Sequence, residues 1–287
     1  MTSHTPSSSV LSQAAPRAEI SDYYDNTLLD YDRWSPEGYL HFGYWRPYLN
    51  PFVRRPMLEE MNRFIFQHLG LADLHEGAVA DLGCGVGAVS RFGSQLYPQL
   101  EFHAMSISPG QIASALQRHA AQRVTYHCGD YHTLPFADES ISGVFYLESL
   151  CHSTQPEQAL NEAARVLKPG GRIVMTDGYL LKPLEKSSRL FRYVAEGVAH
   201  NWAVPMFHEL ALARQWTGGG RLKLVEDIEC GWRLGPSALH AAHLSLLHFF
   251  KLMWRRDRTT PWQWRHLTAS AFTIALGLYR TNFRYHL

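Results

Sequence analysis

Apolar residues in the middle of the chain follow two alternating spacings. Short, nearly continuous apolar runs predict buried strands at residues 79–82, 102–107, 124–128, 141–147 and 172–176. Between these runs, apolar residues recur at helical spacing, which predicts helices at residues 56–69, 88–96, 109–121 and 156–167. Strands that alternate with helices in this way favour an α/β fold, a Rossmann-like, parallel and doubly wound sheet.

The pattern changes on both sides of this core. Upstream, residues 19–45 are rich in aromatic and polar side chains, and a Ser-Pro-Glu-Gly break divides them. Downstream, we expect a helical insertion at 183–216, a strand at 222–228, helices at 236–256 and 261–280, and an edge strand at 282–287. The prediction is one domain over residues 19–287, in which a cap segment (19–70) and a lid region (181–287) flank a core (71–180).

Composition narrows the class of protein. The 287 residues carry a net charge of +1, so nucleic-acid binding is not expected. The most apolar stretch, residues 239–254, contains three histidines and a lysine, so no integral membrane segment is expected either. Four cysteines without CxxC spacing predict reduced thiols and a cytoplasmic location. The first eighteen residues are Ser/Thr/Pro-rich and lack the apolar core of a signal peptide, so residues 1–18 are expected to be a disordered tail. The sequence is compatible with a homo-oligomer.

The first predicted strand leads into a glycine-rich turn. Asp81 ends the strand, and Gly83, Gly85 and Gly87 follow at alternate positions before the next helix. Such a turn lets the backbone approach a ligand and presents N–H groups to it. Ligands of open α/β sheets also bind at the carboxyl ends of the strands. We therefore expect a binding site here; an ordinary strand-to-helix turn is the competing interpretation.

Further motifs follow in a fixed order between residues 79 and 176. They are Asp-Leu-Gly-Cys-Gly-Val-Gly at 81–87, Ile-Ser-Pro-Gly-Gln at 107–111, Gly-Asp at 129–130, Leu-Pro-Phe at 134–136 and Arg-Val-Leu-Lys-Pro-Gly-Gly at 165–171. In order and spacing this series resembles the class I S-adenosylmethionine-dependent methyltransferases. A nicotinamide-binding Rossmann enzyme is the structural competitor, but it usually carries GxGxxG and lacks the Lys-Pro-Gly-Gly block.

This resemblance implies S-adenosylmethionine as the cofactor. Asp81 would meet its ammonium group, the glycine turn its methionine end, and Asp130 the adenine amino group, with Tyr131 covering the ring. The residues expected at the cofactor are Tyr24, Asp81, Gly83, Cys84, Gly85, Gly87, Ser106, Ile107, Gln111, Asp130 and Tyr131.

One position departs from the family pattern. At the end of the second strand, where an acid usually holds both ribose hydroxyls, this chain has Ser106. A serine makes neutral hydrogen bonds and not the stronger charge-assisted pair, so ribose binding is expected to depend on the Ile107 backbone and Gln111. This departure and the aromatic segment at 39–45 are similar to the sterol, tocopherol and prenyl diphosphate methyltransferase group.

The subgroup resemblance implies methylation of an alkene carbon of a hydrophobic isoprenoid, with a prenyl diphosphate as the leading substrate. The resulting carbocation would be stabilised by ring faces, about 0.5–2 kcal/mol each. The 13% aromatic content suits such a pocket, although the same rings can simply pack on the core. The residues expected at the substrate are Tyr39, Phe42, Tyr44, Trp45, Trp202 and Phe207.

A base must then remove a proton to restore the alkene. Glu148 is the first candidate, and His152 and His41 are the others. Glu148 has a competing interpretation as a helix cap or an arginine partner. A diphosphate would require cations, and magnesium is expected only with such a substrate; no protein-held metal site is expected. The candidate cations are Arg189, Arg192, Arg255, Arg256, Arg258, Arg265, Arg280 and Arg284.

Three alternatives stay open. The same fold supports O- or N-methylation of a small natural product, with Glu148 or His152 as the base. Methylation coupled to cyclisation can proceed from the same carbocation. A non-catalytic subunit that binds S-adenosylmethionine and regulates a partner would keep the glycine turn without needing a base.

Overall fold

The computed structural model describes residues 17–118, 123–255 and 261–287. Most of the predicted tail therefore lies outside the described residues, and its last two positions begin the first helix. The helices are α1 (Arg17–Trp34), α2 (Arg54–Leu69), α3 (Ala88–Leu96), α4 (Pro109–Arg118), α5 (Pro156–Val166), α6 (Arg189–Asn201), α7 (Leu210–Ala213), α8 (Gly231–Arg255) and α9 (Pro261–Leu278).

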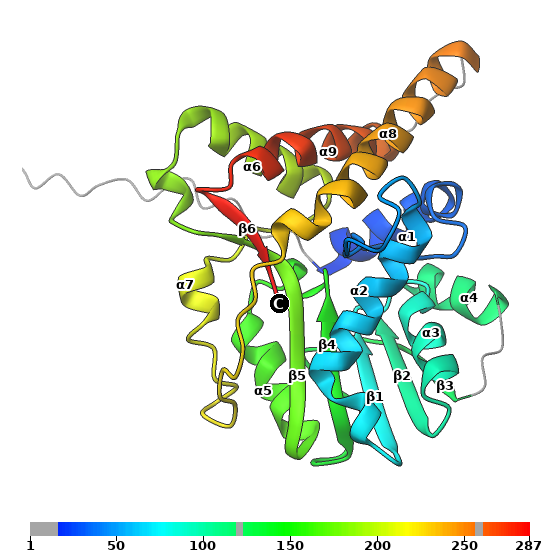
Figure 1. Cartoon of the computed structure of the whole chain (residues 1–287), viewed down its shortest axis with the longest axis vertical. Coiled ribbons are helices and arrows are strands. Elements are labelled where there is room, and N and C mark those ends of the chain that lie inside the picture. Colours follow the sequence, from blue (N-terminus) through cyan, green and yellow to red (C-terminus); the bar gives the residue numbers. More distant parts are fainter. Residues whose placement is uncertain (1–16, 119–122, 256–260) are drawn as a thin grey trace, which may run out of the picture.

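Six strands form one sheet in the order β3-β2-β1-β4-β5-β6. The first five are parallel, and β6 pairs with β5 in the antiparallel direction. This order confirms the predicted Rossmann-like fold (Figure 1). The strands are β1 (Gly77–Leu82), β2 (Leu100–Ser106), β3 (Val124–Cys128), β4 (Ile141–Leu147), β5 (Leu167–Leu180) and β6 (Phe283–His286).

The central strands bury both of their faces. Val79 and Phe145 pack into one core with residues of α2 and α3, whereas Ala80 and Tyr146 pack into a second core with residues of α5. Successive side chains of a strand point to opposite faces, and both faces here are covered by helices. This double burial is why β1 and β4 appear in the sequence as continuous apolar runs.

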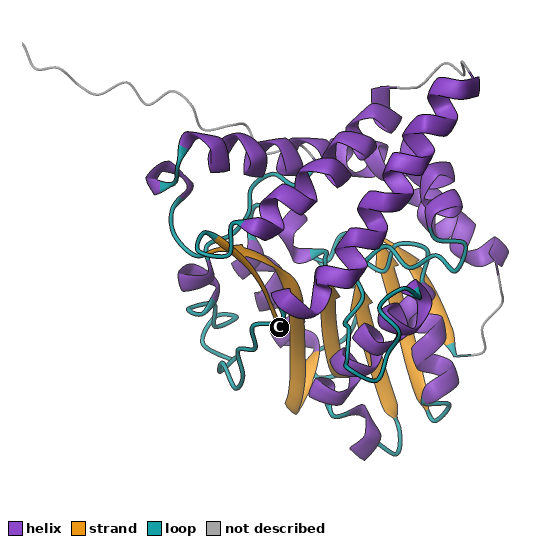
Figure 2. Cartoon of the chain, turned by 45° about the horizontal axis from the view of Figure 1, so that its top comes forward, coloured by secondary structure: helices purple, strands orange, loops and turns teal. Residues whose placement is uncertain are grey.

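A layer of helices lies beyond the carboxyl ends of the parallel strands. Helices α6, α8 and α9 cross this end of the sheet, and α1 lies beside them (Figures 1 and 2). Helix α6 packs on α9 through Phe191 and Leu276, and α1 packs against both α4 and α9. The expected helical insertion after β5 is thus present as α6 and the short α7.

Two local expectations were wrong. Residues 222–228 form no strand: positions 223–227 are all exposed, and Val225 is 81% exposed. At the end of this segment Ile228 exchanges two backbone hydrogen bonds with Leu287. Residues 168–171 lie between the predicted helix (156–167) and the predicted strand (172–176), yet they belong to β5, which begins at Leu167.

Candidate functional site

A cavity opens at the carboxyl ends of β1, β2 and β4, next to α1. It lies where the glycine turn, the ends of these strands and the segment after α1 meet. Its lining residues are Ile20, Tyr24, Gly38, Leu40, His41, Asp81, Gly83, Cys84, Gly85, Ala88, Val89, Met105, Ser106, Ile107, Gln111, Gly129, Asp130, Tyr131, His132, Leu147, Glu148, Ser149 and His152.

The glycine turn is packed too tightly for side chains. Gly83 has φ +93°, and a Cβ there would lie 2.3 Å from the Ser149 Cβ. A Cβ on Gly85 would lie 2.8 Å from the Leu40 side chain. The N–H groups of Gly83 and Cys84 donate to the Met105 carbonyl at 2.9 and 2.8 Å, which joins the ends of β1 and β2. The turn therefore offers a ligand a bare backbone wall; Gly87 lies behind it, before α3, and does not line the cavity.

Asp81 is a buried carboxyl group on this wall. Its Oδ2 accepts a hydrogen bond from the Ser90 hydroxyl at 2.7 Å, and the side chain is 2% exposed. Burial raises the pKa of Asp81 to about 7, because the charged form loses its water. An ammonium group in the cavity would supply the missing counter-charge, so the residue suits a ligand with an amino acid end.

Ser106 and Gln111 form a hydrogen-bonded pair at the end of β2. The Ser108 N–H donates to the Ser106 Oγ at 3.1 Å, and the Ser106 hydroxyl donates to the Gln111 Oε1 at 2.6 Å. This leaves the amide nitrogen of Gln111 as the polar group for a ligand. The site therefore presents a neutral donor where an acid would present two acceptors.

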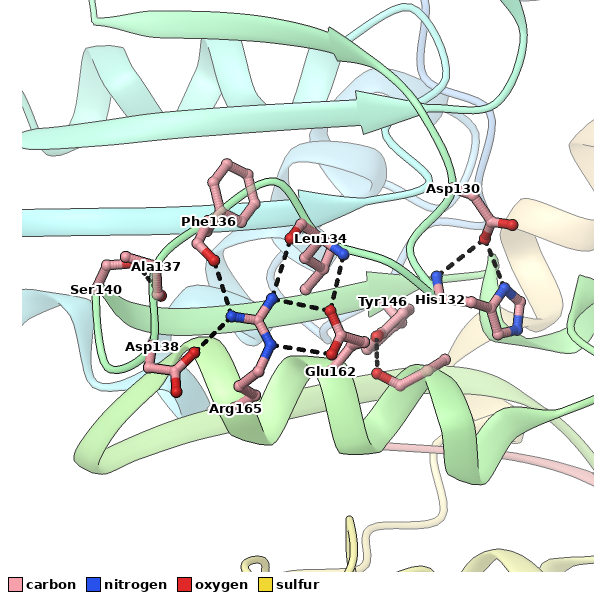
Figure 3. Close-up of polar contacts among 11 residues, drawn as sticks. Asp130, His132, Leu134, Phe136, Ala137, Asp138, Ser140, Tyr146, Glu162 and Arg165 are labelled. Atoms are coloured by element: carbon pink, nitrogen blue, oxygen red, sulfur yellow. Dashed lines mark hydrogen bonds and ion pairs between the residues drawn. The ribbon is translucent and has the colours of Figure 1, made fainter.

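Asp130 begins a short polar relay on the loop after β3. Its Oδ1 accepts from the backbone N–H of His132 at 2.9 Å and from the His132 Nδ1 at 2.6 Å. Since the carboxylate can only accept, Nδ1 carries the proton and Nε2 accepts from the Ser153 hydroxyl at 2.7 Å. These contacts fix the orientation of the Asp130 carboxyl at the cavity (Figure 3).

The rest of this loop is held by Arg165 of α5. Its guanidinium donates to the Leu134 and Phe136 carbonyls at 3.0 and 2.9 Å and pairs with Glu162 and Asp138 (Figure 3). The Arg165 contact lowers the pKa of Glu162, whose Oε2 also accepts from the Leu134 N–H. The family motif at 165–171 thus begins with a residue that shapes the adjoining loop.

Helix α1 is attached to the start of α4. The Asp25 Oδ1 accepts from the Ser108 hydroxyl and from the Gly110 N–H, the latter at 3.1 Å. Ser108 in turn accepts from the Gln111 N–H at 3.0 Å. The same helix carries Tyr24 into the cavity, so α1 covers the site from the side of β2.

Tyr24 and His152 form a hydrogen-bonded pair in the cavity. The His152 Nδ1 lies 3.0 Å from the Ala203 carbonyl, which can only accept, so Nδ1 carries the proton. The Nε2 lone pair then accepts from the Tyr24 hydroxyl at 2.9 Å. Burial lowers the pKa of His152, which keeps the imidazole neutral at pH 7. The pair combines a neutral base with a hydroxyl already directed at it.

Glu148 lies at the end of β4 with a left-handed backbone, φ +49°. Its Oε1 accepts from the Phe42 N–H at 2.8 Å and from the Tyr285 hydroxyl at 2.9 Å. Burial raises the pKa of Glu148 to about 8, and the neighbouring Asp177 adds to the effect. The carboxyl group joins three distant segments and lines the cavity.

His41 also lines the cavity, but its ring is committed to the backbone. Its Nδ1 donates to the Phe42 carbonyl at 2.9 Å, and burial lowers its pKa to about 4. The side chain is 4% exposed, so it holds the segment that carries Phe42. Its role as a base stays a prediction.

The six aromatic residues expected at the substrate do not line this cavity. Tyr39 and Tyr44 are buried in the core, and Tyr44 stacks on Phe64 with 4.4 Å between ring centroids. The other four contact aromatic rings outside the cavity lining: Phe42 contacts Trp202, Trp45 contacts Trp232 and Phe207 contacts Phe283. Their substrate roles therefore stay predictions.

Among the described residues, the cavity lining contains no lysine or arginine. Among the candidate cations, Arg280 lies 3.5 Å from Glu229, and the Arg284 Nε donates to the Arg280 carbonyl at 3.0 Å. Arg256 and Arg258 lie outside the described residues. Within the described ranges, no cluster of three or more His, Cys, Asp or Glu could hold a metal ion. No helix in the same ranges is long and apolar enough to cross a bilayer.

Sequence reasoning missed several groups at the site. Tyr285 reaches Glu148 through β6, which folds back beside β5, and no local motif marks it. Leu40 lines the cavity, although only its aromatic neighbours were predicted from the sequence to contact a ligand. His132, by contrast, directly follows the motif residues Asp130 and Tyr131, and its position offered a signal.

Comparison with known proteins decides the family. The sequence model of a methyltransferase domain matches residues 80–175. The chain is 32% identical over 274 residues to the 27-O-demethylrifamycin SV methyltransferase of Amycolatopsis mediterranei, covering 91% of this chain and 90% of that protein. The chain belongs to the class I S-adenosylmethionine-dependent methyltransferases.

The other similarities cover less of the chain or have lower sequence identity. Methyltransferase GfsG of Streptomyces halstedii is 32% identical over 166 residues, and the match spans 55% of this chain and 57% of that protein. Among solved structures, the [4+2]-cyclase SpnF has a TM-score of 0.74 at 18% identity, covering 95% of both chains. A geranyl diphosphate methyltransferase has a TM-score of 0.72 at 15% identity, covering 94% of this chain and 97% of that one. At these identities the structures share the fold alone.

Proposed function

We propose that this methyltransferase transfers the methyl group of S-adenosylmethionine to a hydroxyl oxygen of a small natural product. The observation that carries the proposal is the neutral His152 imidazole, whose Nε2 accepts from Tyr24 inside the cavity. An alcohol is a poor nucleophile until a base receives its proton, and a neutral imidazole is a suitable base near pH 7. The relative whose match spans 91% of this chain is named a 27-O-demethylrifamycin SV methyltransferase, and a 27-O-demethyl compound is one that lacks a methyl group on an oxygen.

The cofactor is held by groups at the ends of β1, β2 and β3. Asp81 would bind its ammonium group, Gln111 the ribose, and Asp130 the adenine end. When bound, S-adenosylmethionine supplies a methyl group on a positively charged sulfur. The tight backbone wall at Gly83 and Gly85 favours close approach of such a ligand, since any Cβ there would collide with neighbouring residues.

Tyr24 and His152 together provide a route for the proton. As the acceptor oxygen gains the methyl group, its proton passes to the Tyr24 oxygen and the Tyr24 proton passes to the His152 Nε2. The Ala203 carbonyl, 3.0 Å from Nδ1, then faces the imidazolium and stabilises it. The product side holds a neutral ether and a protonated His152, which releases its proton to solvent when the site opens.

A diphosphate substrate receives little support from the cavity. Of the residues that the structure describes, those lining the cavity include no lysine or arginine to pair with phosphate oxygens, and phosphate recognition normally uses such cations. The leading substrate of the sequence-based prediction, a prenyl diphosphate, is therefore replaced in this proposal by an uncharged molecule.

The second candidate is methylation of an alkene carbon with Glu148 as the base. It is favoured by the position of the Glu148 carboxyl on the cavity wall. This reaction requires the carboxylate, which predominates only above a pH of about 8. Turnover by the second candidate would thus rise through pH 8, whereas turnover based on neutral His152 would not require ionised Glu148.

The test is product analysis with isotope-labelled S-adenosylmethionine. The panel contains hydroxylated polyketides, hydroxyquinones, phenols, prenyl alcohols and prenyl diphosphates. We expect label on oxygen, with alcohols or phenols as substrates. Label on carbon, or product from prenyl diphosphates alone, would contradict the proposal, as would the absence of product across the panel from protein that binds the cofactor.

A further inference from the structure

The contacts of Glu148 are unevenly divided between its two oxygens. Both donors, the Phe42 N–H and the Tyr285 hydroxyl, approach Oε1. Within the described residues, Oε2 has no hydrogen-bond partner, and it is not fully buried. The residue keeps some accessible surface and lines the cavity. Oε2 is therefore the oxygen available to a ligand.

The surroundings of this carboxyl favour its neutral form. Burial raises the pKa of Glu148, and Asp177, a buried carboxyl that accepts from the Cys151 N–H at 3.0 Å, raises it further, whereas the two hydrogen bonds at Oε1 lower it. Burial also raises the pKa of Asp177 to about 7, raises those of Cys151, Cys230 and Tyr285, and lowers that of His152. Among the described residues, the cavity lining supplies no cation to stabilise a carboxylate. With Oε1 accepting two hydrogen bonds, the proton resides on Oε2.

We propose that Glu148 is a substrate-binding group that donates a hydrogen bond from Oε2 to a carbonyl oxygen of the molecule being methylated. The inference rests on the proposed O-methylation and narrows its substrates to hydroxylated ketones, quinones or esters. A carbonyl is the matching partner because it only accepts. A carboxylate ligand would face the acidic pair Glu148 and Asp177, and an ammonium ligand would ionise the group.

The structure also explains how the donor is kept in place. The Phe42 N–H comes from the segment before α2, and the next residue, Gly43, donates to the Ser237 hydroxyl of α8 at 2.7 Å. Tyr285 comes from β6. Two separate segments, one of them attached to α8, therefore hold the carboxyl in one orientation, which is what discrimination by a hydrogen bond requires. A substrate without the carbonyl would leave a buried donor without a partner.

Glu148→Gln distinguishes this role from that of a base. The amide oxygen can accept from Phe42 and Tyr285, and the amide nitrogen can donate to the carbonyl, but the amide cannot remove a proton. The leucine side chain in Glu148→Leu is of similar length, but it can neither form these hydrogen bonds nor remove a proton. Glu157→Gln, an exposed position on α5, is the matched control.

The experiment measures binding of two probes to the protein saturated with S-adenosylhomocysteine, by titration calorimetry at pH 6.5. The probes are meta-acetylphenol, which has a carbonyl group, and meta-ethylphenol, which has a CH2 group in its place. We expect wild type, Glu148→Gln and Glu157→Gln to prefer the acetyl compound by about fivefold or more. Glu148→Leu should lose this preference while still binding S-adenosylhomocysteine.

A second readout follows the carboxyl group directly. The infrared difference spectrum of wild type minus Glu148→Gln should contain a protonated carboxyl band at pH 6.5 that shifts when meta-acetylphenol binds and disappears above pH 9. Equal affinity for the two probes in wild type, no binding of either, loss of the preference in Glu148→Gln, or absence of the band would each overturn the inference. Because these measurements need no turnover, their failure is distinct from a failure to form O-methylated product.

Discussion

The Tyr24 hydroxyl lies 2.9 Å from the His152 Nε2, although the two residues are 128 positions apart in the sequence. Tyr24 belongs to the helix that covers the cavity, and His152 belongs to the segment after β4. The acid–base pair is therefore complete only when α1 lies on the core.

Removing this pair should abolish most of the turnover. We expect His152→Gln to lower kcat about 100- to 10,000-fold, the usual contribution of a general base, and Tyr24→Phe to lower it less because water can replace the hydroxyl. Tyr193→Phe, at an exposed ring of α6, should leave kcat unchanged. The check is steady-state kinetics with an alcohol substrate, alongside calorimetric titration of S-adenosylhomocysteine. A His152→Gln enzyme with normal kcat would remove the pair from the mechanism.

Cofactor affinity should depend on pH through Asp81. Its pKa of about 7 means that the empty site carries a protonated carboxyl below pH 7, whereas an ammonium ligand needs the carboxylate. The affinity for S-adenosylhomocysteine should therefore fall as the pH drops from 7.5 to 5.5, approaching about tenfold per pH unit. Asp81→Asn should bind more weakly at pH 7.5 and lose this dependence. A wild-type affinity that is flat across this range would contradict the role of Asp81.

Asp25 should control how long the cofactor stays bound. It attaches α1 to the start of α4 through Ser108 and Gly110. Asp25→Ala removes this attachment, so we expect S-adenosylhomocysteine to dissociate several-fold faster while the melting temperature changes little. Stopped-flow displacement measures the rate. Asp22→Ala, at an exposed position of the same helix, is the control, and equal rates for the two variants would sink the idea.

Replacing Arg165 should mainly lower the stability of the fold. Its loss removes the donor from the Leu134 and Phe136 carbonyls and leaves the Glu162 carboxylate with only the Leu134 N–H. Because the side chain is 26% exposed, solvent replaces part of these contacts, and we expect Arg165→Ala to cost about 1–3 kcal/mol of unfolding free energy. Urea denaturation checks the value. Arg221→Ala, at an exposed position directly after Gly220, is the control and should lower the unfolding free energy by less than about 0.5 kcal/mol.

The elements that the sequence predicted well are those encoded by neighbouring residues. The turn at Gly83 and Gly85, β3 and β4 follow from local apolar runs and special backbone requirements, so their positions could be predicted closely. Residues 222–228 show the limit of that reasoning. Their alternation has the spacing of a strand, but strand formation also needs a partner along its edge, which only Ile228 finds.

The site itself was harder to predict because its groups meet across long separations. Glu148 stood out in the sequence, but Tyr285 and the Phe42 N–H, which hold its Oε1, come from other elements. The aromatic residues at 39–45 stood out for their density, yet Tyr39 and Tyr44 serve the core. Aromatic content reports burial in general, and only packing decides which ring faces a ligand.

The most direct test of the account is the position of an isotope-labelled methyl group in the product formed from a hydroxylated ketone or quinone. Mass spectrometry and carbon NMR of the purified product distinguish a methyl ether from a methyl group on carbon. The account predicts a methyl ether in wild type, retained in Glu148→Gln and lost in His152→Gln. A carbon-bound methyl group, formed by wild type and lost in Glu148→Gln, would contradict it and establish Glu148 as the base.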